Sequence, residues 1–100
     1  MALILLAEKD PKFCSNIQKE FVSAGHEVVT ALSQEETLRL LPSRSYEVVV
    51  LGMDIVREGD MDLINYVKQA QPLCEILILT AIDEIESAVR ALRRMSAPRS

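Results

Sequence analysis

Short apolar runs alternate along the chain with segments whose apolar residues recur every three or four positions. The run Val48–Leu51 has no polar interruption, which is typical of a strand covered on both faces in a parallel sheet. Other runs have a similar length and are bounded by turn-forming or polar residues. The pattern predicts four β-strands, at residues 2–7, 26–31, 47–51 and 75–80.

Helix start and stop signals separate these runs. Asp10 is suited to the N-cap of a helix, Pro11 to its first turn and Gly25 to its end. Ser33 and Glu36 have the spacing of a capping box, which opens a second helix. The predicted helices cover about residues 11–24, 33–42, 60–70 and 83–95, and residues 52–60 are predicted to form a loop.

This order of elements predicts a single α/β domain over residues 1–95 with a short tail at 96–100. Strands that alternate with helices form a parallel sheet with helices on both faces, a doubly wound arrangement with right-handed crossovers. A chain of 100 residues that is 49% hydrophobic can bury a core without disulfides or metals. Cys14 and Cys74 lack the spacing of metal or redox sites, and we expect reduced thiols in a cytoplasmic protein.

Composition and missing motifs exclude several functions. A net charge of −4 argues against nucleic-acid binding by this domain, because phosphate contacts need a basic face. The N-terminal apolar run is short, lacks a basic region before it and meets Glu8, so it is not a signal peptide. No run has the length of a membrane span. The three glycines form neither a dinucleotide-binding motif nor a P-loop.

Four segments in order carry a family resemblance. The apolar run Leu3–Leu6 leads to Glu8 and Lys9, and the later segments are Ala-Gly-His-Glu-Val-Val-Thr-Ala at 24–31, Tyr-Glu-Val-Val-Val-Leu at 46–51 and Ile-Leu-Ile-Leu-Thr-Ala at 76–81. Each segment alone is moderately specific, but the ordered set covers nearly the whole chain. The sequence resembles a receiver domain of two-component signalling. The resemblance implies a flavodoxin-like fold with strand order 2-1-3-4.

The resemblance also implies roles for the residues that follow the strands. In that family the first strand ends in two acidic residues that help hold Mg²⁺, and the third ends in the aspartate that becomes phosphorylated. Here Glu8 matches the first acidic position, Lys9 stands at the second, and Gly52 stands at the phosphoacceptor position. Thr80 matches the family's switch hydroxyl and Ala81 the small residue beside it.

These departures predict lost phosphotransfer chemistry. Gly52 has no carboxylate to accept a phosphoryl group, and Lys9 places a cation where Mg²⁺ needs oxygen ligands. We therefore expect a receiver-like protein-interaction module of a phosphorelay, not an enzyme, without a cofactor. At Glu8 and Lys9 we favour a plain loop over a local ion pair between the two residues. The alternative is an atypical phosphoreceiver that uses Asp54 with Glu8, and only this alternative requires Mg²⁺.

The family's fifth strand and fifth helix have no counterpart in the 100 residues, which predicts a truncated (βα)4 form. The strand at 75–80 would then be an apolar sheet edge, and such edges tend to find partners. We expect self-association or docking of a signalling protein through this strand and the helix at 83–95. Alternatively, a longer protein covers the same face. The candidate interface residues are Ile76, Ile78, Ile82, Ile85, Arg90 and Arg93.

Overall fold

The computed structural model describes residues 1–79. The elements are β1 (Leu3–Ala7), α1 (Pro11–Ser23), β2 (Glu27–Ala31), α2 (Gln34–Leu40), β3 (Val48–Gly52), α3 (Met53–Val56), α4 (Leu63–Ala70) and β4 (Glu75–Leu79). The predicted helix at 83–95, the tail at 96–100 and the candidates Thr80, Ala81, Ile82, Ile85, Arg90 and Arg93 lie outside the described residues.

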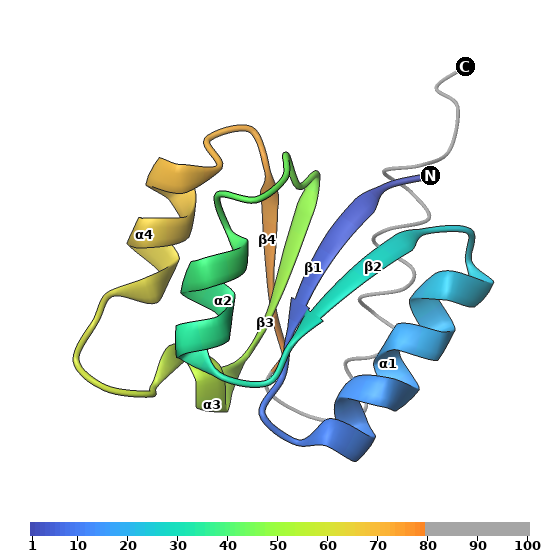
Figure 1. The fold of residues 1–100 in the computed structure, drawn as a ribbon, viewed down its shortest axis with the longest axis horizontal. Coiled ribbons are helices and arrows are strands. Elements are labelled where there is room, and N and C mark those ends of the chain that lie inside the picture. The colour runs from blue at the N-terminus through green and yellow to red at the C-terminus, as the bar shows by residue number, and fades with distance from the viewer. Residues whose placement is uncertain (80–100) are drawn as a thin grey trace.

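The four strands form one parallel sheet in the order β2-β1-β3-β4. Helix α1 covers one face of the sheet, and α2, α3 and α4 lie on the other (Figure 1). The predicted α/β class, doubly wound layers and strand order are therefore confirmed. The carboxyl ends of all four strands meet at one end of the sheet, near α3, and the amino ends meet at the opposite end (Figure 1).

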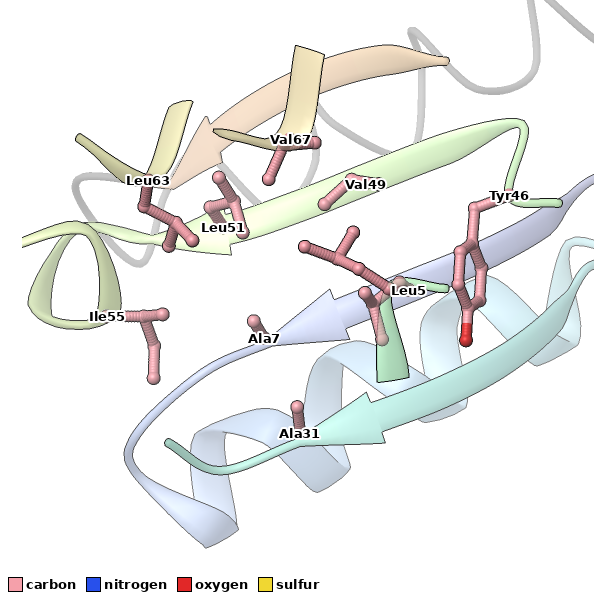
Figure 2. Close-up of a cluster of buried hydrophobic side chains, with 10 residues drawn as sticks. Leu5, Ala7, Ala31, Tyr46, Val49, Leu51, Ile55, Leu63 and Val67 are labelled. Atoms are coloured by element: carbon pink, nitrogen blue, oxygen red, sulfur yellow. The ribbon is translucent and has the colours of Figure 1, made fainter. Parts of the chain in front are cut away.

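Two apolar clusters hold the layers together. On the α1 face, Phe21 and other fully buried helix residues pack against one set of strand side chains. On the opposite face, alternate strand residues pack against α3 and α4, as Figure 2 shows. Val48 and Val50 belong to the first cluster, whereas Val49 and Leu51 belong to the second. This alternation explains why β3 is apolar at every position.

The predicted caps of α1 are confirmed. The side chain of Asp10 accepts hydrogen bonds from the backbone N–H groups of Lys12 (3.0 Å) and Phe13 (3.4 Å). Pro11 occupies the first helical position. Gly25 follows the C-cap residue with a φ of +92°, a left-handed conformation that favours glycine.

The capping pair that opens α2 differs in one detail from a reciprocal capping box. Ser33 Oγ accepts a hydrogen bond from Glu36 N at 3.0 Å, as predicted. The carboxylate of Glu36, however, accepts from Leu32 N at 3.1 Å instead of from the N-cap residue. The helix start is therefore satisfied by two side chains, but one bond reaches a residue further back.

The predicted loop at 52–60 was wrong in one part, because it contains the short helix α3. Ile55 in α3 is fully buried, and its carbonyl accepts a hydrogen bond from Gln34 Nε2 at 3.0 Å. A contact with α2 thus fixes a helix that is too short to show helical periodicity. Helix α4 begins later than predicted, at Leu63, because the side chain of Asp62 caps it through Asn65 N at 3.1 Å.

At the amino end of the sheet, Gln71 joins two loops through three hydrogen bonds. Its Nε2 donates to the carbonyls of Leu41 (2.7 Å) and Arg44 (2.9 Å), and its Oε1 accepts from Tyr46 N (3.2 Å). A depression of about 600 Å³ lies beside this junction, lined by residues 42–46 and 70–73. The loop before β3 and the loop before β4 are therefore bound to each other by one side chain.

His26 also lies at the amino end, just before β2. It is 5% exposed, and its Nδ1 accepts a hydrogen bond from Ala2 N at 3.0 Å. Its Nε2 is buried without a partner among the described residues. Burial and the positive N-terminus lower the pKa of His26, while Glu47 opposes this effect.

Candidate functional site

The candidate site lies where β1 and β3 end side by side. Ala7 of β1 pairs with Leu51 of β3, so Glu8 and Gly52 follow at adjacent positions. Gly52 is buried, with φ −67° and ψ 144°. Any residue can adopt this extended backbone conformation. The glycine is therefore not required by the backbone, and the reason for it must lie in the space around it.

The carboxylate of Glu8 occupies that space. A Cβ atom added to Gly52 would lie 2.5 Å from Glu8 Oε1, 3.1 Å from Glu8 Cδ and 3.3 Å from the carbonyl oxygen of Ala7. Glu8 is only 7% exposed. Its Oε2 accepts a hydrogen bond from Asp10 N at 2.9 Å, and its own N–H donates to the carbonyl of Ala31 at 2.9 Å. These bonds tie Glu8 to the loop before α1 and to β2.

Glu8 and Lys9 do not form the local ion pair that was the alternative to a plain loop. Lys9 Nζ instead lies 3.6 Å from Glu58 Oε2, in the segment between α3 and α4. The Glu8 carboxylate is directed to Gly52 and Asp10 N, so Lys9 pairs with the loop that follows β3. Glu58 was not predicted to be the partner of Lys9. The available signal was the negative charge of Glu58 in the segment that follows β3.

Asp54 was predicted to lie in a loop. The structure places it instead in the first turn of α3, where it is exposed. An acidic residue in the first turn of a helix is stabilised by the helix dipole. No hydrogen bond within residues 1–79 involves the Asp54 side chain. Sequence proximity to Gly52 therefore did not predict its surroundings.

The residues present do not fit a Mg²⁺ site. Mg²⁺ requires several oxygen ligands in a near-octahedral arrangement. Here one oxygen of Glu8 accepts a backbone hydrogen bond, and Lys9 brings a positive charge to the same loop. Within residues 1–79, no three His, Cys, Asp or Glu side chains are grouped so that they could hold a metal ion.

Burial disfavours the thiolate form of both cysteines by raising the pKa of each. Cys14 is buried on α1, and burial together with the nearby negative charges of Glu8 and Glu36 raises its pKa to about 11. Burial also raises the pKa of Cys74. Both cysteines are free, and Cys14 belongs to the apolar cluster under α1. In the part of the chain that the structure describes, no helix is long and apolar enough to cross a membrane.

Comparisons of sequence support the same family. The family model of the response regulator receiver domain matches residues 4–97. The transcriptional regulatory protein GlrR of Escherichia coli is 31% identical over 93 residues, and the response regulator protein FleR of Pseudomonas aeruginosa is 25% identical over 96 residues. The matches cover 93% and 96% of this chain, but only 21% and 20% of these relatives. The chain thus spans about a fifth of their length.

Comparisons of structure agree. A response regulator receiver domain from Clostridium thermocellum is 28% identical, with a TM-score of 0.71 over 94% of this chain and 76% of that one. A two-component response regulator from Clostridium difficile shares the fold, with a TM-score of 0.74 at 20% identity over 97% of this chain and 100% of that one. The chain therefore belongs to the response regulator receiver domain family, the receiver domains of two-component systems.

Proposed function

We propose that this receiver domain is not phosphorylated at the family's usual position and acts as a protein-interaction module in a signalling pathway. The observation that carries the proposal is the pair formed by Gly52 and Glu8. The resemblance places the phosphoacceptor at Gly52, which has no side chain, and the Glu8 carboxylate lies within 2.5 Å of where that side chain would begin. A nucleophilic carboxylate on β3 is therefore missing, and the space for one is filled.

The charges around this position also support the proposal. The second acidic position of the family is Lys9, whose ammonium group pairs with Glu58 at 3.6 Å. A phosphoryl group would enter without a metal ion to balance its charge, beside the negative carboxylate of Glu8. We therefore propose that the domain is not an enzyme and needs no cofactor.

The sheet edge at β4 is the surface that we propose for a partner. Within residues 1–79, β4 pairs only with β3. Ile76 and Ile78 pack partly against the cluster on the α4 face, so their side chains already contribute to the fold. The part of β4 that we propose for a partner is the backbone edge with which no strand within residues 1–79 pairs, and a second copy of this chain could add a strand there.

The pathway is proposed by analogy with the relatives. GlrR is named a transcriptional regulatory protein, and this chain covers 21% of its length. We propose that the present domain receives or passes on a signal in the cytoplasm through a protein partner. Because the net charge is −4, we do not assign DNA contacts to this domain.

Intact mass spectrometry after incubation with a small-molecule phosphodonor tests the loss of phosphorylation. The chain is treated with and without Mg²⁺, alongside the Burkholderia pseudomallei response regulator whose structure contains a phosphorylated aspartic acid. We expect no adduct on this chain under conditions that modify the control. A Mg²⁺-dependent adduct would overturn the proposal. Its loss in Asp54→Asn would then assign the chemistry to Asp54, the alternative acceptor.

Sedimentation velocity over a wide range of protein concentration tests the interaction surface. Self-association through β4 predicts a sedimentation coefficient that rises with concentration. A single monomeric species at the highest concentration would contradict the role of a second copy as the partner. This outcome would leave the phosphorylation result unaffected, so the two parts of the proposal are tested separately.

A further inference from the structure

The backbone conformation of Gly52 does not explain why this residue is a glycine. Its φ of −67° suits any residue, and it is the N-cap of α3, where Asp, Asn or Ser would cap the helix better than glycine. α3 has no side-chain cap at this position. Local propensity thus favours a polar side chain here. A contact from another strand must oppose it.

The contact comes from β1. Glu8 Oε1 lies 2.5 Å from the position of a Cβ on residue 52, a separation similar to that between Cβ and a carboxylate oxygen within an aspartate. We propose that Glu8 and Gly52 form a single unit in which the Glu8 carboxylate, delivered from the end of β1, permanently fills the place of the missing side chain on β3. Glu8 is thus the internal occupant of the former acceptor position.

Several contacts hold the Glu8 carboxylate there. Oε2 accepts the N–H of Asp10, whose own side chain caps α1. The backbone N–H of Glu8 is bound to the carbonyl of Ala31 in β2, which fixes the start of the side chain. With 7% of its surface exposed, Glu8 has little room to turn away without breaking the bond to Asp10. The Glu8 residue is therefore held both at its backbone and at its carboxylate.

This inference rests on the proposed function only in identifying Gly52 with the former acceptor position. It adds that a side chain at residue 52 and the Glu8 carboxylate in its present position exclude each other. Restoring an aspartate on β3 would therefore require the Glu8 carboxylate to leave its present position and its bond to Asp10 N. Replacing glycine by alanine at a compatible backbone conformation usually stabilises a protein. A decrease in stability on Gly52→Ala would therefore point to a steric conflict at this position.

A double-mutant cycle measured by thermal unfolding tests the exclusion. We expect Gly52→Ala to lower Tm by roughly 4–8 °C in the unaltered chain, and to lower it by much less, or raise it, in a Glu8→Ala background. An equal loss in both backgrounds would overturn the proposal, because the carbonyl of Ala7 would then be the obstacle. No loss in the unaltered chain would also overturn it. If Gly52→Ala fails to fold, recovery of folding by Glu8→Ala supports it, and continued failure overturns it.

A matched control uses Glu35, an exposed glutamate on α2 that forms an ion pair with Arg39 at 3.8 Å. Glu35→Ala removes the same side chain at a distant position. We expect the effect of Gly52→Ala to be the same with and without Glu35→Ala. Rescue by Glu35→Ala would show a general effect of charge and would overturn the specific role of Glu8.

A second pair of variants tests the charge of the occupant. Asp and Asn at residue 52 have similar size and both can cap α3, but only Asp repels a carboxylate. We expect Gly52→Asp to have a lower Tm than Gly52→Asn, and the difference to shrink in a Glu8→Gln background. A difference that Glu8→Gln leaves unchanged would overturn the claim that the Glu8 carboxylate occupies this place. These unfolding measurements are independent of whether Asp54 becomes phosphorylated.

Discussion

The two ends of the sheet are held together in different ways. At the amino end, Gln71 makes three hydrogen bonds to backbone groups, and buried His26 accepts the N–H of Ala2. At the carboxyl end, the carboxylate of Glu8 lies beside Gly52, and a half-exposed ion pair joins Lys9 to Glu58. In parallel sheets, ligand sites lie at the carboxyl ends of the strands. The amino end also has an ion pair between Arg44 and Glu27 at 2.6 Å, so this fold joins its loops by hydrogen bonds and a short ion pair at one end and by the longer ion pair between Lys9 and Glu58 at the other.

Among the substitutions that test this comparison, Gln71→Ala is expected to change the free energy of unfolding most. Gln71→Ala would leave the carbonyls of Leu41 and Arg44 and the N–H of Tyr46 without their side-chain partner. Because these groups are partly accessible to water, we expect a loss of about 2–3 kcal/mol in the free energy of unfolding. Urea denaturation measures this loss.

Gln69→Ala is the matched control for Gln71→Ala, because Gln69 lies on the exposed side of α4. Alanine has a high helix propensity, so the control should be nearly neutral. A similar loss in both variants would show that the junction of the two loops does not stabilise the amino end.

A smaller effect is expected from the protonation of His26. Its pKa is lowered in the folded state, so the unfolded chain binds the proton more readily. The neutral imidazole therefore stabilises the fold above its ordinary pKa of 6.5, and this contribution is lost as the pH falls through the lower folded pKa. We expect Tm to decrease when the pH is lowered from 7.5 towards 5.5.

His26→Asn separates this titration from those of other groups. Asparagine does not titrate but offers an oxygen that can accept the N–H of Ala2, as Nδ1 does now. We expect the variant to show a flatter dependence of Tm on pH than the unaltered chain. An unchanged pH dependence would show that His26 is not its source.

The fold was largely predictable because its signals are local. The strands, the caps at Asp10 and Ser33, and the order of elements follow from apolar periodicity and from residues close in sequence. The helix α3 was missed because its hydrogen bond with Gln34 joins positions far apart in the sequence. Tertiary contacts of this kind leave no periodic signal.

The resemblance predicted which residues to consider for the candidate site, but not which contacts these residues make. The resemblance identified Gly52 and Lys9 as the altered positions and Glu8 as the retained one. It did not predict that Glu8 would occupy the space at Gly52, or that Lys9 would pair with Glu58. Side-chain direction decides both contacts, and adjacent residues on a loop share a position in sequence without sharing a direction.

The smallest effect is expected at the pair formed by Lys9 and Glu58. The side chain of Lys9 is 57% exposed, so solvent screens its attraction to Glu58, and exposed pairs of this kind contribute roughly 0–1 kcal/mol. Lys9→Gln should therefore change the free energy of unfolding by less than about 1 kcal/mol, and the change should decrease at high salt. A double-mutant cycle with Glu58→Gln isolates the pair. A coupling well above that range, insensitive to salt, would mean that a charge pair holds the carboxyl end as firmly as Gln71 holds the amino end, and the contrast between the two ends would fail.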